Sequence, residues 1–385
     1  MDALSGIRVL DFSRYGPGRQ CTMFLADFGA EVITVEVPRN DPSLPAVDTD
    51  DISFRYLALN RNKKSLALNL RTPEGKEVIY RLARKVDVVV EGFRPGVMKR
   101  LRLDYDTLGE FNRRLIYCSL SGYGQDGPYV LRSGHDVNYL GLSGILDLTR
   151  DRGGNPVLIG TQVADLGGGM SQAVMGILLA LLARERTGRG QYVDISMFDG
   201  LIAWHWLNGA EYLIRGRLSG RFFGKSPAYN IYQTRDRKHV TLGIIEPWFW
   251  ERFCKAIERE DFIPYMEPSE KSEEVIAELG QLFGTRTRDE WMELLSEINI
   301  PFGPVNTVEQ AFSDPHTLQR RMVVEVEQPR VGKIKLLGIP VKLSETPGEI
   351  RTPSPAYGEH TLDILGELDY TNDDLARLRK AKTIE

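Results

Sequence analysis

The sequence predicts an α/β protein in which a parallel β-sheet covered by helices forms the first half and a smaller α+β region follows. Short β-branched runs alternate with helical periodicity in the first half, which is the pattern of a parallel sheet. The segment Val86–Gly92 is almost continuous in valine, as a strand buried on both faces should be. Near Ser226 a hairpin pattern and capped helices begin, which indicates a second region.

The strands of the first half are expected at β-branched runs between turn signals. They are Ile7–Phe12, Glu31–Val37, Ser65–Leu70, Val86–Glu91 and Leu115–Ser121. After the third run, Thr72 and Pro73 predict the start of a helix, because a capping side chain followed by proline favours that boundary.

The second half adds one long apolar helix and several shorter elements. The run Ala173–Ala183 has 11 residues, fewer than the ~20 that a membrane span needs, so a buried helix is expected and a membrane partner is not. A hairpin is expected over Asn230–Ile245, with its polar turn at Arg235–Lys238. Capping signals at Thr287 and Thr371 predict further helices.

Composition argues against several classes of function. The 385 residues carry 49 Lys plus Arg against 53 Asp plus Glu, a formal charge of −4 without a basic block, so no nucleic-acid partner is expected. Cys21, Cys118 and Cys254 are odd in number and far apart, which favours a reducing cytoplasm over a disulfide framework. The histidines lack paired ligand spacing, so no metal site is expected.

The segment Gly122–Gly127 formally matches the GxGxxG pattern of dinucleotide-binding loops. That fingerprint needs a helix starting at the third glycine, whereas Pro128 and Tyr129 follow here. A nicotinamide or flavin cofactor is therefore not expected, although the glycine backbone can still approach a ligand closely.

An aspartate and a histidine stand in unusual settings. Asp165 precedes Gly167–Gly169 at the start of the apolar helix, and three glycines are costly there, so something bulky is expected to approach this turn. Plain helix capping by Asp165 is the alternative. His135 and Asp136 follow Gly134 on a loop, where a surface histidine in a turn is the alternative.

Further charged residues lie near predicted strand ends. Glu246 is a lone acid between an apolar strand and a helix that begins with proline, and it can equally be a first-turn helix residue. Basic residues cluster at Arg61–Lys64, Arg71, Arg94 and Lys99–Arg100. Since ligands of parallel sheets bind at the carboxyl ends of strands, an anionic cofactor is one interpretation, and a solvated basic edge is the other.

Several segments occur in the order and at the spacing of one known family. They are Arg61–Gly75, Glu91–Gly96, Ser121–Pro128, Ala164–Gly169 and Thr187–Gln191. Together they resemble the family III CoA-transferase superfamily (CaiB/BaiF type), which also contains the α-methylacyl-CoA racemases. The likeness runs from about residue 4 to the C-terminal helix.

This resemblance implies a domain organisation and a substrate class. A Rossmann-like large domain is expected over residues 1–200, completed by the returning C-terminus 340–385, with a smaller α+β domain over 226–325 and linkers at 201–225 and 326–339. An interlocked homodimer acting on acyl-CoA is also implied. Coenzyme A would be the thioester carrier, and no tightly bound cofactor is expected.

Three segments are similar to the racemase branch in particular. Racemases carry GHDxNY, ADxGGG and IEPxF segments, which this chain matches at Gly134–Tyr139, Ala164–Gly169 and Ile245–Phe249. In the transferases the histidine position is commonly aromatic, and a glycine-rich loop that shields an aspartyl-CoA intermediate replaces the glutamate segment. The resemblance therefore implies inversion of the α-carbon of a 2-methylacyl-CoA by two bases.

The resemblance also implies roles for individual residues. His135 and Asp165 are the expected bases, and Asp136 or Glu246 is expected to orient the imidazole. Backbone N–H groups of Leu166–Gly168 are expected to stabilise the enolate oxygen. CoA contacts are expected from Arg39, Asn69, Arg71, Phe93, Arg94, Arg100, Gly122, Tyr123 and Tyr139.

Two other functions are compatible with the same residues. A CoA-transferase would use Asp165 as a nucleophile that forms an aspartyl-CoA intermediate, with no role for His135. A non-catalytic acyl-CoA-binding protein would keep the basic groove and tolerate the loss of Asp165. Substitution of His135 discriminates the first two functions, because only proton transfer needs the imidazole.

Overall fold

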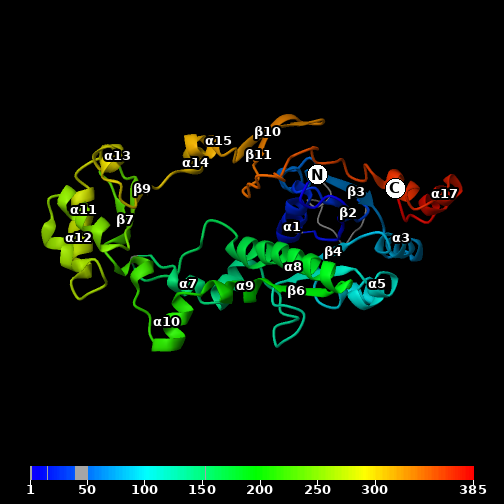
Figure 1. Ribbon diagram of the computed structural model, residues 1–385, viewed down its shortest axis with the longest axis horizontal. Coiled ribbons are helices and arrows are strands. Elements are labelled where there is room, and N and C mark those ends of the chain that lie inside the picture. The colour runs from blue at the N-terminus through cyan, green and yellow to red at the C-terminus, as the bar shows by residue number, and fades with distance from the viewer. Residues whose placement is uncertain (1, 15, 40–50, 152) are drawn as a thin grey trace. The chain divides into compact units, whose positions relative to one another are not determined.

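The computed structural model describes residues 2–14, 16–39, 51–151 and 153–385 (Figure 1). The chain divides into two compact units. The first comprises Met1–Ile145, Ile159–Trp204 and His316–Glu385, and the second comprises Leu146–Leu158 and His205–Pro315. Each unit is described by itself.

The first unit is built on a six-stranded parallel sheet, which confirms the predicted fold class. Its strands lie in the order β3-β2-β1-β4-β5-β6. They are β1 (Arg8–Asp11), β2 (Glu31–Glu36), β3 (Lys63–Ala67), β4 (Val88–Glu91), β5 (Ile116–Ser121) and β6 (Tyr192–Ser196). The valines of β4 are fully buried, as predicted, because helices cover both faces of the sheet. The strand order reverses between β1 and β4, the point at which such sheets bind ligands.

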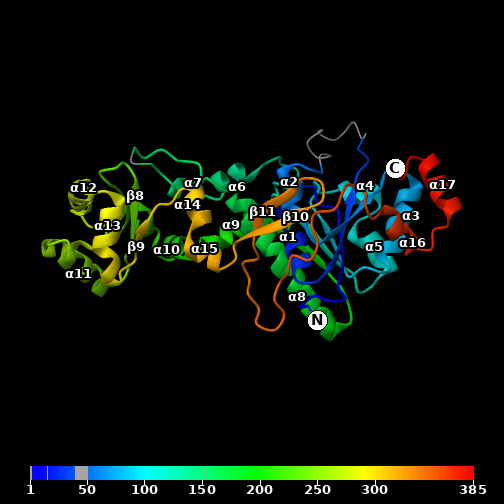
Figure 2. The ribbon, with the colours of Figure 1, turned by 90° about the horizontal axis from the view of Figure 1, so that it is seen from above.

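Helices cover the sheet in two groups (Figures 1 and 2). One core contains apolar side chains of α3 (Pro73–Ala83), α5 (Tyr105–Phe111), α16 (Thr361–Gly366) and α17 (Asn372–Lys380). The other group contains α1 (Gly16–Asp27) and α8 (Gln172–Thr187). The predicted start of α3 is confirmed, since the Thr72 hydroxyl accepts the N–H of Gly75 at 3.1 Å. The other elements of this unit include α2 (Phe54–Leu59), α4 (Val97–Leu101), α6 (Asp136–Leu142), the π-helix η2 (Ala164–Ser171), α9 (Met197–Trp204), α15 (Pro315–Gln319), β10 (Val323–Gln328) and β11 (Gly332–Leu337).

Two residues of the basic cluster at the start of β3, Arg61 and Lys63, are buried in the protein interior, which corrects both interpretations drawn from the sequence for these two residues. Arg61 is buried against Asp27 at 2.7 Å, and its guanidinium also donates to the carbonyl of Leu337. Lys63 is fully buried against Asp11 at 3.2 Å. These charges therefore hold α1 and the returning C-terminal segment on the sheet, and burial makes each of them dependent on its partner.

The apolar helix is only half buried, contrary to the prediction. Its sheet-facing side chains are buried, but Met175, Leu178, Leu179 and Leu182 are exposed by 48%, 39%, 67% and 55%. Together with η2 it forms one continuous helix, Ala164–Thr187, which is long and apolar enough to cross a membrane by length and composition alone. Core helices of soluble proteins also meet this criterion. A helix on a sheet buries one face, and its other face is uncovered in the single chain.

The second unit is a small α+β domain. Strands β7 (Tyr229–Gln233), β8 (His239–Gly243) and β9 (Phe302–Pro304) form an antiparallel sheet. Its helices include α11 (Pro247–Ala256), α12 (Ser272–Phe283) and α13 (Arg288–Leu295), which pack around Trp250, Phe283 and Trp291. The predicted hairpin is confirmed with Gln233 opposite His239, and so is the capping box at Thr287. Its other elements include α10 (Asn208–Arg215), η3 (Arg221–Lys225) and α14 (Val308–Ser313).

Candidate active site

A cleft of about 1140 Å³ lies along the carboxyl ends of the parallel strands in the first unit. The segments that follow β1, β2, β4, β5 and β6 all contribute to its lining. His135 and Asp165 both line it, together with Asn138, Tyr139 and Gln162. The topology therefore brings together two sequence-predicted residues that lie far apart in the chain.

His135 directly precedes α6 and is exposed on the wall of the cleft. Its backbone N–H donates to Oδ1 of Asn138 at 3.0 Å, and the Tyr139 hydroxyl donates to the carbonyl of Gly134 at 2.6 Å. A Cβ on Gly134 would lie 2.8 Å from the Tyr139 ring, so glycine is needed for this close packing. The first turn of α6 thus fixes the backbone that carries the imidazole.

Asp165 lies in the first turn of η2, where Val163 rather than Asp165 occupies the N-cap position. Plain capping by Asp165, the alternative drawn from the sequence, is therefore wrong. Burial, aided by the negative charge of Asp136, raises the pKa of Asp165 to about 6, against an opposing effect of His135. A carboxyl group with this pKa can both accept and donate a proton near neutral pH.

The three glycines after Asp165 are explained by a neighbouring helix. A Cβ on Gly167 would lie 2.0 Å from the Trp204 ring, and one on Gly168 would lie 2.3 Å from the carbonyl oxygen of Met197. Something bulky does approach this turn, as predicted, but in the structure it is α9. The glycines therefore allow two backbones to pack closely and are not by themselves a ligand signal.

Several backbone N–H groups at the start of η2, where oxyanion donors were expected, already have acceptors within the chain. The N–H of Leu166 donates to the carbonyl of Gln162 at 3.0 Å, so this donor is already used within the chain. The N–H groups of Ala164 and Asp165 donate to Oδ1 of Asp136 at 2.7 and 3.1 Å. The first turn of η2 is thus a satisfied helix start, which corrects the expectation for Leu166.

Five of the residues predicted to contact CoA line the cleft. They are Phe93, Arg94, Gly122, Tyr123 and Tyr139. Tyr123 and Tyr139 meet edge to face at 5.1 Å, and Gly122 leaves room for the Tyr139 hydroxyl. Arg94 donates to the Ser133 hydroxyl at 2.7 Å, next to the segment that carries His135. Tyr123 and Tyr139 therefore contact each other in the wall of the cleft, and Arg94 is held beside the segment that carries His135.

The other predicted CoA contacts do not line the cleft. Asn69 and Arg71 lie in the connection between β3 and α3, where Asn69 is hydrogen-bonded to Lys382 and Thr383. Arg100 is exposed in the last turn of α4. Arg39 pairs with Asp51 at 3.0 Å and stacks on Tyr357, which does line the cleft.

Glu246 belongs to the second unit. It occupies the N-cap position of α11 ahead of Pro247, and its side chain makes no capping hydrogen bond. Its Oε2 atom is buried and has no hydrogen-bond partner among the described residues. A buried carboxylate oxygen without a hydrogen-bond partner lowers the stability of the folded state, so its position at the start of a helix does not explain why a glutamate is present.

Sequence reasoning missed four arginines of the cleft. Each stacks on an aromatic ring: Arg14 on Phe93, Arg19 on Tyr56, Arg55 on Phe54 and Arg132 on Tyr129. With Arg94 they outnumber the acidic residues of the lining, Glu36 and Asp165. Stacking holds a guanidinium in place while leaving donors for an anion. The only sequence signal was the position of Arg14 just after a predicted strand.

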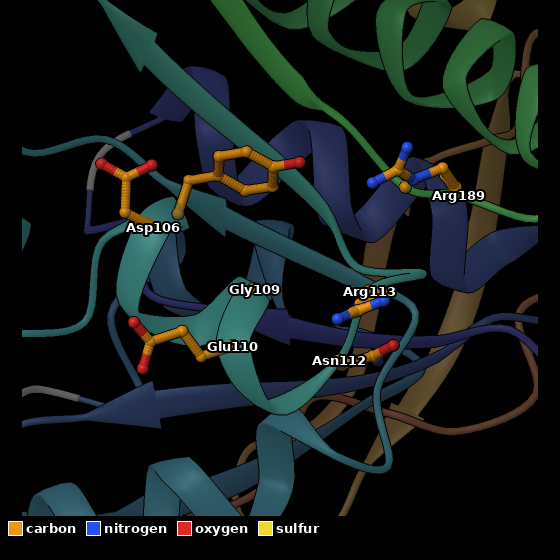
Figure 3. Close-up of a pocket in the computed structure, with 8 residues that line it drawn as sticks. Asp106, Gly109, Glu110, Asn112, Arg113 and Arg189 are labelled. Atoms are coloured by element: carbon orange, nitrogen blue, oxygen red, sulfur yellow. The ribbon is translucent and has the colours of Figure 1, made fainter.

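A second pocket of about 790 Å³ lies between α5 and the segments that precede β5 and β6 (Figure 3). Its acidic side chains, Asp106 and Glu110, come from α5, and Arg113 and Arg189 come from the segments before β5 and β6. None of the predicted site residues lies there. Among the described residues, no group of three or more His, Cys, Asp or Glu side chains could hold a metal ion.

Comparisons with known proteins identify the family of this chain. The family model "CoA-transferase family III" matches residues 4–361. The chain is 36% identical to an acyl-CoA transferase of Fusarium pseudograminearum, covering 98% of this chain and 87% of the relative. It is 34% identical to the human alpha-methylacyl-CoA racemase, and the match covers 100% of this chain and 98% of the racemase.

A solved structure shares the fold. The crystal structure of a CAIB/BAIF family protein from Brucella suis superimposes with a TM-score of 0.81 at 29% identity, covering 96% of this chain and 100% of that one. Relatives named as racemases and as transferases match over nearly the whole length. On this similarity the chain belongs to CoA-transferase family III.

Proposed function

We propose that this enzyme is a racemase that inverts the α-carbon of 2-methylacyl-CoA thioesters. The supporting observation is that His135, directly before α6, and Asp165, in the first turn of η2, line one cleft. Inversion needs two bases, because one base would tend to return the proton to the face from which it came.

Each base removes the α-proton of one enantiomer and leaves an enolate thioester. The conjugate acid of the other base then protonates the opposite face of that carbon, so the two protonation states exchange with each turnover. The raised pKa of Asp165, about 6, allows its carboxyl to hold or release a proton near neutral pH, which favours this exchange. Glu246 is proposed as a further functional carboxylate, since its Oε2 atom is buried without a partner in the described chain.

Coenzyme A is proposed to lie along the cleft as the carrier of the acyl group, with no tightly bound cofactor. The excess of arginines over acids in the lining suits its phosphates. Phe93, Arg94, Gly122, Tyr123 and Tyr139 are the proposed contacts among the predicted residues. Arg39 is proposed to act at the cleft end through its stack on Tyr357.

A CoA-transferase is the second candidate. A half-buried Asp165 at a helix start also suits a nucleophile that forms mixed-anhydride and aspartyl-CoA intermediates. The identity to the Fusarium acyl-CoA transferase, 36%, is similar to the 34% identity to the human racemase. The match of Gly134–Tyr139 to the racemase segment, with its histidine in the cleft, favours proton transfer.

Incubation of one enantiomer of a 2-methylacyl-CoA in D2O, without an acceptor acid, tests the proposal. We expect deuterium at the α-carbon with inversion, lost by at least about 10²-fold in His135→Ala because general-base catalysis contributes that much. His239→Ala, at an exposed histidine of the second unit, is the matched control and should retain exchange. CoA transfer to an added carboxylate that survives His135→Ala, without any exchange, would establish the transferase instead.

We also propose that the enzyme is a cytoplasmic homodimer. The exposed apolar side chains of α8, and Leu213 and Ile214 of α10, form surfaces that a second copy would cover. Light scattering should give twice the chain mass of 43.5 kDa, and Leu179→Glu should shift it toward one chain mass. A wild-type protein that scatters as a single chain would contradict the dimer. All three cysteines are free and buried, which suits a reducing compartment.

A further inference from the structure

Asp136 is the first residue of α6, yet it does not line the cleft. Its Oδ1 atom accepts the N–H groups of Ala164 at 2.7 Å and Asp165 at 3.1 Å. These N–H groups belong to the first turn of η2, where a helix has no internal acceptors for its donors. One carboxylate therefore joins the start of α6, next to His135, to the start of η2.

We infer that Asp136 is a positioning residue that acts on Asp165: it ties the two helix starts together and places a negative charge beside the Asp165 carboxyl. This assignment differs from orientation of the imidazole, because the bonds of Oδ1 run to the backbone of η2. A carboxylate that accepts two N–H groups makes charge-assisted hydrogen bonds, which fix geometry more firmly than neutral ones. The consequence is that the two proposed bases keep one relative position.

The charge of Asp136 also acts on proton affinity. A nearby like charge disfavours ionisation, and Asp136 adds to burial in raising the pKa of Asp165 to about 6. A two-base reaction gains from this, because Asp165 must carry the proton in one direction of the reaction.

The charged groups on the elements packed against η2 have other partners or act on Asp165 as follows. Asp27 of α1 pairs with Arg61 at 2.7 Å, and Glu185 of α8 pairs with Arg114 at 3.4 Å. At the start of α6, His135 lowers the pKa of Asp165. Within α6, burial raises the pKa of Tyr139, and Asp165 adds to that effect. On α1, Arg19 pairs with Glu36 at 3.7 Å. On β6, Asp194 accepts the N–H of Gln125, and Asp199 of α9 acts on Asp194. The basic residues of the last turn of α8, Arg184 and Arg186, lie at the opposite end of that helix.

Two substitutions separate charge from geometry. Asp136→Asn keeps an acceptor oxygen at the same place and removes the charge, whereas Asp136→Ala removes both. The Asp165 carboxyl is titrated by ¹³C NMR in protein labelled at aspartate, with Asp165→Asn used to assign the signal. The inference uses the proposed function only where Asp165 is called a base, and this titration needs no turnover.

We expect the pKa of Asp165 to fall by about one unit in Asp136→Asn, as loss of a neighbouring like charge requires. The acidic limb of the pH profile for α-proton exchange should move down by the same amount. In Asp136→Ala, loss of two charge-assisted bonds should lower kcat by about tenfold to a hundredfold more than in Asp136→Asn, with little change in KM. Asp374→Asn, a capping carboxylate of α17, is the control and should leave the Asp165 signal unmoved.

An Asp165 pKa that stays the same in Asp136→Asn would overturn the electrostatic part. Equal kcat values for the Asn and Ala variants would overturn the positioning part. If the titration shifts as expected while no exchange is seen even in the wild type, the racemase proposal fails and the action of Asp136 on Asp165 stands. Circular dichroism of Asp136→Ala shows whether a lower kcat reflects unfolding. If that variant is unfolded, the inference is tested with Asp136→Asn alone.

Discussion

Asp165→Asn is expected to lower the rate of α-proton exchange by about 10³-fold, because the amide can neither accept nor donate the proton that a base must carry. Asn has nearly the same shape as Asp, so the cleft and its acyl-CoA binding should persist. The measurement is single-turnover exchange in D2O at saturating thioester, alongside binding by calorimetry. Exchange within tenfold of the wild type would remove Asp165 from the reaction.

The same substitution should stabilise the folded protein at neutral pH. The pKa of Asp165 is raised from 3.8 to about 6, mainly by burial, so the folded state binds more protons than the unfolded state between these values. Stability therefore falls as the pH rises through this window, and the full cost is present above it. Solvent screens a half-buried group, so we expect a gain of about 1–2 kcal/mol at pH 7.5 in Asp165→Asn.

Urea unfolding at pH 7.5 and at pH 3.5 checks this prediction. The difference between Asp165→Asn and the wild type should largely disappear at the lower pH, where the carboxyl is protonated in the folded state and mostly protonated in the unfolded state. An equal gain at both pH values would mean that packing rather than ionisation causes it. Loss of activity combined with gain of stability is the usual signature of a functional group held in an unfavourable environment.

Gly168→Ala is expected to destabilise the first unit by about 3 kcal/mol or more, since overpacking against backbone cannot be relieved by a side-chain rotation. The added Cβ would lie 2.3 Å from the carbonyl oxygen of Met197, and on the facing helix Gly200 already lies against Gly168. Helices η2 and α9 would have to separate, which would also displace Asp165. Urea denaturation measures the free energy of unfolding, and the rate of α-proton exchange should fall together with that free energy.

Gly280→Ala is the matched control. Gly280 lies within α12, and a Cβ there meets no atom within 4 Å. The same Gly→Ala substitution at this position should therefore stabilise the protein by about 0.5–1 kcal/mol, because Ala has the higher helix propensity. If Gly168→Ala were as stable as the wild type, close packing of α9 could not be the reason for the glycine run.

Much of the fold was determined by local sequence alone. The valine run of β4, the Thr72 cap, the hairpin turn near Arg235 and the capping box at Thr287 were all predicted, because each depends on neighbours within a few residues. The sequence also predicted that no helix starts at Gly127, because Pro128 and Tyr129 follow it. In the structure the next helix starts at Asp136.

Only the tertiary structure decided which partners distant residues meet. The sequence marked Asp165 and the glycines after it, but it could not show that α9 fills the space beside them, or that Asp136 bonds to η2 and Arg61 to Asp27. Those contacts join segments that are far apart in the chain, so no local propensity or periodicity encodes them. The sequence by itself thus determined the elements and the reactive residue types, whereas long-range packing decided which charges are buried in ion pairs and which face the cleft.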